Sequence, residues 1–272
     1  MGRRLDLING KSAHHESTGV RTFFVAPLKG RRRGHLLLPE QKATADMHIM
    51  EGFLPAGHAL AWGAVSMPVV ALGLRSIGRR SKEKPELKML LGVSAAFTFV
   101  LSALKLPSLT GSCSHPTGTG LGAILFGPVA MAPVATIVLI FQALLMAHGG
   151  LTTLGANVFS MGIVGPLVGY VLYRIGQRLR LPPAPVLFFA AALADMATYL
   201  TTSLQLALAF PDPAGGVTTS LVKFLAIFAP TQVPLAACEG VLTVLIFNYL
   251  RRYSSPELAM LGISPAATEA RP

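Results

Sequence analysis

The chain has 272 residues, of which 52% are hydrophobic and 13% are charged, and its formal net charge at pH 7 is +11. Soluble domains carry about 25% charged residues. Here the charges are clustered and leave apolar runs long enough to cross a bilayer core of about 30 Å. The basic residues lie between these runs, as the positive-inside rule describes, so we expect a lipid bilayer and no nucleic acid as the partner. The alternation typical of a membrane β-barrel is absent. The composition predicts an all-α polytopic membrane protein.

The first 46 residues differ from the rest of the chain. Residues 1–46 are basic and contain no apolar region of about 7–15 residues, which a secretory signal needs. Their apolar surface is too small to offset the entropy of folding. We expect either a start codon assigned upstream of the true one or a disordered basic extension. The predicted organisation is a leader over 1–46, a transmembrane domain over 47–252 and a polar tail over 253–272.

About seven apolar spans follow the leader, if the proline-containing stretch 121–147 is divided in two. Pro128 and Pro133 each remove a helix donor, so they favour this division, with a short first piece. Pro230 and Pro234 are expected to break the last stretch, which is counted as one crossing with a re-entrant piece or a steep tilt. The spans cover, in chain order, residues 58–75, 87–105, 121–147 (two segments), 158–173, 184–210 and 221–249.

The distribution of basic residues predicts how these spans are oriented. Clusters at 75–88, 174–180 and 251–252 all fall on the cytoplasmic side when 121–147 is counted as two segments. Met47 and the loops over 106–120, 148–155 and 211–217 then lie outside. This orientation brings Met47-His48 and His115 to the same side of the membrane.

Met47-His48 and His115 carry the clearest chemistry in the sequence. A chain that begins at Met47 would have an amine, a peptide nitrogen and an imidazole that can close adjacent chelate rings around one divalent metal. His115, in the loop GSCSHPTGTG, is a candidate for the remaining position. Nitrogen ligands suit Ni(II), Cu(II), Co(II) or zinc, and Glu51 is a candidate acceptor that orients His48. The alternative is that both histidines are surface residues of polar loops.

Four further residues are candidates for a functional or structural role. We expect His148 to hold a loop by hydrogen bonding, and we do not assign Cys113 as a ligand. Asp195 and Glu239 are the acids deepest in the apolar spans. They are either functional groups within the membrane or members of buried hydrogen bonds between helices. No phosphate-binding loop of the form GxxxxGK[ST] occurs, so the chain has no ATPase activity of that kind.

Three motifs in this order resemble the CbiM family. They are MHIMEGFLP at 47–55, GSCSHPTGTGLGAILFGP at 111–128 and AHGGLTTLGAN at 147–157. Members of this family are the substrate-capture components of energy-coupling factor cobalt transporters, and they are close to the nickel-specific NikM proteins. The resemblance implies a seven-helix fold in which the amino terminus enters the bundle as a metal-binding loop. The implied ligands are the Met47 amine, the His48 amide and imidazole nitrogens, and the His115 imidazole.

The resemblance also implies a function. The chain would capture Co(II) for cobalamin biosynthesis in a bacterial cell membrane, with Ni(II) as the alternative substrate. It would have no catalytic residues and no cofactor. Its implied partners are a small membrane subunit, a transmembrane coupling subunit and a cytoplasmic ATPase pair. Residues 1–46 depart from the family pattern, because a leader that persists would acylate the Met47 nitrogen.

Two other classes of function stay open at the level of sequence. A membrane-embedded metalloenzyme would use Asp195 or Glu239 beside the metal, but a site saturated by four nitrogens leaves no open coordination position. The second class is a scaffold protein that needs no metal and whose polar loops serve only for packing.

Overall fold

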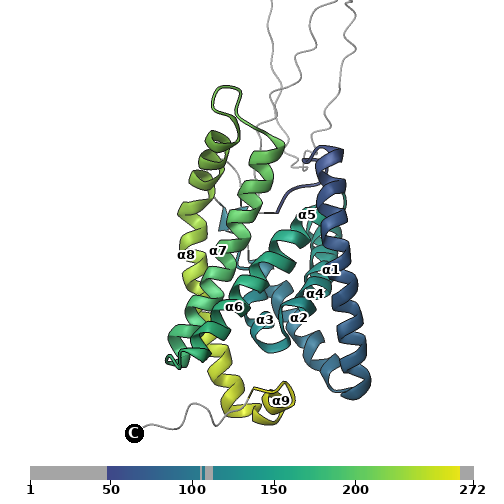
Figure 1. The fold of residues 1–272 in the computed structure, drawn as a ribbon, viewed down its shortest axis with the longest axis vertical. Helices are drawn as coiled ribbons and strands as arrows, with labels where there is room; N and C mark the ends of the chain where they lie inside the picture. Colours follow the sequence, from purple (N-terminus) through teal and green to yellow (C-terminus); the bar gives the residue numbers. More distant parts are fainter. Residues whose placement is uncertain (1–47, 105, 108–112, 264–272) are drawn as a thin grey trace, which may run out of the picture. The chain divides into compact units, whose positions relative to one another are not determined.

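The computed structural model describes residues 48–104, 106–107 and 113–263. The leader 1–46, Met47 and the end of the tail lie outside the described residues. The described chain is a helical bundle (Figure 1). Its elements are α1 (Ala56–Glu83), α2 (Leu87–Ala103), β1 (Leu106–Pro107), β2 (Cys113–Ser114), α3 (Thr119–Phe126), α4 (Pro128–Met146), α5 (Leu154–Asn157), the π-helix η2 (Val158–Val164), α6 (Gly165–Arg178), α7 (Pro183–Ala209), α8 (Gly216–Tyr253) and α9 (Ser255–Met260).

The bundle has the helix lengths and composition of a multi-pass membrane protein. Five helical segments of the described chain are long and apolar enough to cross a bilayer, and α2 is a shorter apolar helix. The five are α1, α4, the continuous segment Leu154–Arg178, α7 and α8. Large apolar side chains such as Leu60 on α1 and Leu145 on α4 are exposed at 74% and 71%. An outer surface of this kind fits lipid, and it confirms the predicted all-α polytopic class.

The predicted division of 121–147 falls at Gly127. This glycine has φ 88° and separates α3 from α4, whereas Pro133 lies inside α4. With eight residues, α3 is only about 12 Å long. The extended residues that precede α3 lie alongside α8, because Ser114 Oγ is 2.8 Å from Thr231 Oγ1. Further along α3, Ile124 packs in one cluster with Phe247. The chain from Cys113 to Phe126 therefore passes through the bundle as extended residues followed by a short helix.

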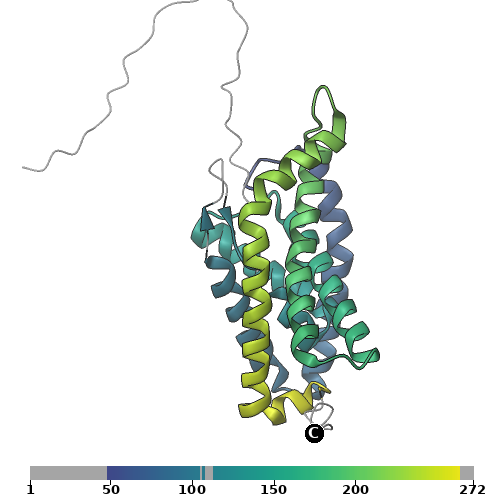
Figure 2. The same cartoon turned by 90° about the vertical axis from the view of Figure 1, so that its left-hand side faces the viewer.

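The prediction that Pro230 and Pro234 break the last stretch was wrong. α8 is one continuous helix of 38 residues with both prolines inside it, and Figure 2 shows it bending in its upper part. Pro230 and Pro234 remove the helix donors to the Ala226 and Pro230 carbonyls. Hydroxyl groups bind two nearby carbonyls, from Tyr199 of α7 to Leu225 and from Thr231 of α8 to Phe228.

Small residues let α1 and α5 approach closely beside the segment that connects the leader to α1. A Cβ atom on Gly155 would lie 2.4 Å from the Gly63 Cα atom, so α5 packs directly on the backbone of α1. The Ser66 hydroxyl on α1 donates to the Gly155 carbonyl at 2.8 Å. Beside this contact, the buried side chain of Ile49 packs with Ala156 and with residues of α7 and α8. The segment before α1 is thus part of the core of the bundle.

Candidate metal centre

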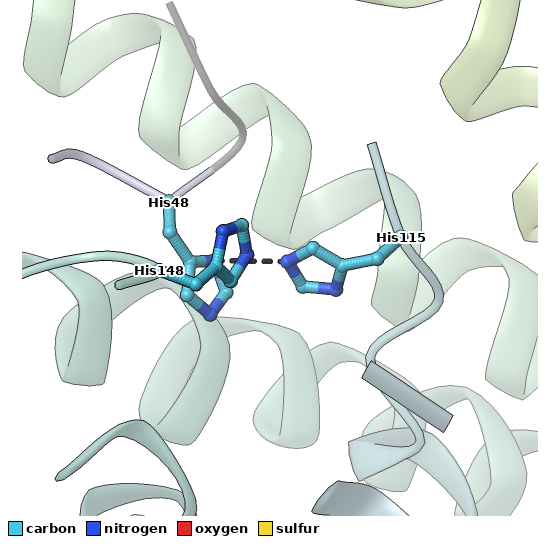
Figure 3. Close-up of side chains that lie close together, drawn as sticks. All are labelled: His48, His115 and His148. Carbon is cyan, nitrogen blue, oxygen red and sulfur yellow. Dashed lines mark hydrogen bonds between the residues drawn. The ribbon is translucent and has the colours of Figure 1, made fainter. Parts of the chain in front are cut away.

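Three histidine side chains meet inside the bundle (Figure 3). His48 precedes α1, His115 lies in the extended segment before α3, and His148 follows α4. One ring nitrogen from each lies within 4.8 Å of the others. The side chains are buried, with exposed fractions of 2%, 0% and 1% respectively. The structure therefore brings the two predicted histidines together and adds a third.

His48 and His115 face one another through defined ring nitrogens. His115 Nε2 lies 3.1 Å from His48 Nδ1. The other nitrogen of His115, Nδ1, lies 2.9 Å from the Pro116 carbonyl oxygen, which only accepts hydrogen bonds. In the neutral ring the hydrogen is therefore on Nδ1, and Nε2 presents a lone pair. Two nitrogens bound at right angles to one metal, each at about 2.0–2.1 Å, lie about 2.9 Å apart. The observed separation is close to that value.

The ring of His148 stacks on His48. Their centroids are 4.7 Å apart and their planes differ by 21°. A tight turn sets this position, because Ala147 and Gly149 on either side both have positive φ, at 46° and 74°. The His148 amide also donates to the Gln142 carbonyl at 3.1 Å. That its ring holds the loop by hydrogen bonding stays a prediction. Its place beside His48 was missed in the sequence, where AHGG was the only signal.

The peptide that follows His48 is clamped by two side chains. The Ile49 amide donates to Asn157 Oδ1 at 2.9 Å, and Asn157 Nδ2 donates back to the Ile49 carbonyl at 3.0 Å. The Thr153 hydroxyl donates to the same carbonyl at 2.6 Å. Asn157 directly precedes the π-helix η2, a type of segment frequent at functional sites. Neither Asn157 nor Thr153 was assigned from the sequence, although both lie in the motif AHGGLTTLGAN.

Glu51 ties the same segment to the turn after His148. Its amide donates to the Gly149 carbonyl at 3.2 Å, and its exposed carboxylate accepts the Thr152 amide hydrogen at 3.2 Å. Hydrogen bonding from Thr152 lowers the pKa of the Glu51 carboxyl group. A Cβ atom on Gly150 would lie 2.4 Å from the Glu51 Cα atom. The described contacts of Glu51 thus hold the loop, and its predicted role in orienting His48 stays a prediction.

The loop that carries His115 is held by Glu239 of α8. The Glu239 carboxylate accepts the amide hydrogens of Thr117 and Gly118 at 2.6 and 3.0 Å, and the Thr117 hydroxyl at 3.0 Å. The other buried acid, Asp195 of α7, accepts a hydrogen bond from Gln232 Nε2 of α8 at 2.5 Å. The described contacts of both acids are the buried hydrogen bonds that the sequence left as one of two alternatives.

The chain is similar to known cobalt transport proteins. Residues 48–257 match the family model CbiM, described as the cobalt uptake substrate-specific transmembrane region. A cobalt transport protein of Pelobacter propionicus is 62% identical over 217 residues, which are 80% of this chain and 96% of that protein. A cobalt transport protein of Streptomyces coelicolor is also 62% identical over 217 residues, and the match covers 80% of this chain and 94% of the relative.

A solved structure is also similar. The crystal structure of a truncated transition metal transporter matches with a TM-score of 0.66 and 27% identity, over 76% of this chain and 99% of that one. The family match covers more than half of the chain, and it includes all three buried histidines, His48, His115 and His148. The chain belongs to the CbiM family, whose members form the substrate-specific transmembrane region of cobalt uptake.

Proposed function

We propose that this chain is the substrate-capture component of a Co(II) importer and that it binds one metal ion at His48 and His115. The ligands would be the Met47 amine, the His48 amide and Nδ1 nitrogens, and His115 Nε2. The observation that carries the proposal is the 3.1 Å separation of His48 Nδ1 and His115 Nε2 inside the bundle. Without metal the two nitrogens share a hydrogen bond (Figure 3), and a metal ion would replace the hydrogen between them.

The chelate would close in two rings. The Met47 amine and the His48 amide nitrogen belong to a five-membered ring with the metal. The His48 amide nitrogen and Nδ1 of the same residue belong to a six-membered ring. The first ring needs a free amine at Met47. The family match begins at residue 48, directly after Met47.

The names of the relatives point to Co(II) as the substrate, and Ni(II) is the alternative. The relatives with 62% identity are named cobalt transport proteins. A set of four nitrogens binds Co(II) and Ni(II) alike by ligand type, and Ni(II) binds more tightly in the usual order of divalent metals. We therefore propose Co(II) from the relatives and not from the ligand set alone. Supply of Co(II) for cobalamin biosynthesis is the pathway that we propose for this uptake.

Import needs partner subunits on the cytoplasmic side. We propose an energy-coupling factor assembly in which a cytoplasmic ATPase pair hydrolyses ATP, joined by a transmembrane coupling subunit and a small membrane subunit. In the proposed orientation the metal centre faces outside and the basic helix ends face the cytoplasm. Four arginines from different segments of the chain line one cavity of about 850 Å³, which supports a common basic end: Arg80, Arg174, Arg180 and Arg251.

Equilibrium dialysis against Co(II) and Ni(II) tests the proposal. The wild-type protein with a free Met47 amine should retain one metal ion per chain. His48→Ala and His115→Ala should each lose that ion, whereas His58→Ala on α1 should retain it as the matched control. Full retention by both variants would contradict the proposal.

A further inference from the structure

A chain of three buried hydrogen bonds leads away from His48 into two helices. His48 Nε2 lies 3.1 Å from Gln142 Oε1 on α4. Gln142 Nε2 donates to the Ser102 hydroxyl oxygen on α2 at 2.6 Å. The Ser102 hydroxyl in turn donates to the Thr98 carbonyl oxygen at 2.5 Å. His48 is 2% exposed and the side chains of Gln142 and Ser102 are fully buried.

The direction of this chain follows from its last member. A backbone carbonyl only accepts hydrogen bonds, so the one hydrogen of the Ser102 hydroxyl is directed at Thr98. The second carbonyl near this hydroxyl, that of Phe99 at 3.2 Å, also only accepts. Ser102 Oγ must therefore accept from Gln142, which places the amide NH₂ group there and the amide oxygen at His48. That oxygen needs a donor, so the hydrogen of the His48 ring is on Nε2.

A neutral imidazole carries one N–H and one lone pair. With the hydrogen on Nε2, the lone pair of His48 is on Nδ1, the nitrogen that lies 3.1 Å from His115 Nε2. The Pro116 carbonyl likewise places the hydrogen of the neutral His115 ring on Nδ1, so that Nε2 carries the lone pair. Nδ1 is also the only ring nitrogen of His48 that can close a six-membered chelate with its own amide nitrogen. The hydrogen-bond chain thus presents the nitrogen that the chelate requires.

We propose that Gln142 is a positioning residue that fixes the Nε2–H tautomer and the ring orientation of His48, so that Nδ1 is ready to bind the metal. The inference rests on the proposed metal site and adds the residue that prepares it. Partners that orient a histidine ligand typically contribute 10- to 100-fold to metal affinity. Gln142 does not contact the metal in this scheme, and its effect reaches the site through His48.

The tautomer can be measured without metal. Nitrogen NMR of the purified full chain, labelled with ¹⁵N in histidine, should show His48 with its hydrogen on Nε2. Gln142→Met removes the acceptor with little change in volume, and His48 should then populate both tautomers. Gln142→Glu keeps an oxygen acceptor and should preserve the wild-type pattern. An unchanged pattern in Gln142→Met would overturn the inference.

Metal affinity provides the second measurement. Titration of the protein with a free Met47 amine should show about 10- to 100-fold weaker binding of Co(II), added as the chloride, in Gln142→Met and only a small change in Gln142→Glu. Ser102→Ala leaves Gln142 in place but removes the group that fixes its amide, and it should show an intermediate loss. Thr136→Val is the matched control on α4, because the Thr136 hydroxyl bonds only to the Ala132 carbonyl among the described contacts.

The outcomes separate this inference from the proposed function. A wild-type protein that binds no Co(II) contradicts the proposed function, while the tautomer measurement still tests Gln142. A wild-type protein that binds Co(II), together with a Gln142→Met variant of equal affinity, contradicts the inference alone. If Gln142→Met does not fold, Ser102→Ala decides, and unchanged affinity and an unchanged tautomer in that variant overturn the inference.

Discussion

Glu239 on α8 accepts the amide hydrogen of Thr117 at 2.6 Å, although the two residues are 122 positions apart in the chain. Thr117 is two residues after His115. The Glu239 carboxylate therefore fixes how deep in the bundle the His115 imidazole lies. The contact joins the longest helix of the described chain to the loop that carries one proposed ligand.

Replacing Glu239 by Gln should loosen this loop. The amide keeps one oxygen but places an NH₂ group against the Thr117 and Gly118 amides, which are donors themselves. We expect the free energy of unfolding to fall by about 1–3 kcal/mol, the range for a buried group left without its partner. Thermal unfolding in detergent measures this. Glu83→Gln, which removes an exposed carboxylate 3.6 Å from Arg79, is the control and should change stability by less than about 0.5 kcal/mol.

Asn157→Ala should release the segment that carries His48. The variant loses both hydrogen bonds between the Asn157 side chain and the Ile49 peptide. Amide hydrogen exchange at Ile49 should accelerate, and metal affinity should fall about 10-fold or more, as for other groups that orient ligands. Exchange at Ile49 that stays as slow as in the wild type would contradict this account of the clamp.

Gly150→Ala should displace the same segment by overpacking. The new methyl group would lie 2.4 Å from the Glu51 Cα atom, a contact that requires the backbone to move. Overpacking typically costs 1–3 kcal/mol. Gly57→Ala on α1 is the matched control, because a Cβ atom there meets nothing within 4 Å. Metal binding should be impaired only in Gly150→Ala, and equal binding by both variants would refute the role of close packing at Glu51.

His148 can be tested by separating its shape from its nitrogens. His148→Phe keeps a flat ring against His48, whereas His148→Ala removes the ring. If the ring supports His48 by stacking, the phenylalanine variant should retain most of the Co(II) affinity and the alanine variant should lose about 10-fold. Complete loss of binding in both variants would instead identify His148 as a ligand.

The turn between α7 and α8 should respond to acid. A hydrogen bond from Lys223 lowers the pKa of Asp212 to about 2. A carboxyl group with a lowered pKa stabilises the folded protein above its ordinary pKa of about 3.9, and this stabilisation is lost as the pH falls toward 2. The difference in melting temperature between the wild type and Asp212→Asn should be constant from pH 5 upward and should shrink below about pH 4. A difference that is independent of pH would contradict the ion pair.

The sequence predicted the helices and two of the three buried histidines for identifiable reasons. The apolar runs and the basic clusters follow directly from the bilayer, so α2 and α7 lie close to their expected ranges. The division of 121–147 followed from Pro128 and Pro133 and was favoured by charge parity, which is a property of the whole chain. Met47 and His48 could be singled out because their chelating chemistry is local to two residues.

The residues that support the histidines were harder to predict. Gln142 meets His48, and Ser102 meets Gln142, only in the folded bundle, so no spacing in the sequence connects these residues. Asn157 is in a recognised motif, but its contact with Ile49 spans 108 positions. The continuity of α8 was missed because prolines are tolerated inside a membrane helix that neighbouring helices support, and α7 packs along α8.

The free amine is the central claim, and Co(II) titration of two proteins tests it most directly. One protein begins at Met47 with a free amine, and the other has the same Met47 amine acetylated, which converts the amine into an amide nitrogen and adds no new amine. The first should bind one Co(II) per chain, and the second should bind about 100-fold more weakly or not at all, because it loses a ligand and not only an orienting partner. Equal affinity in the two proteins would contradict the account.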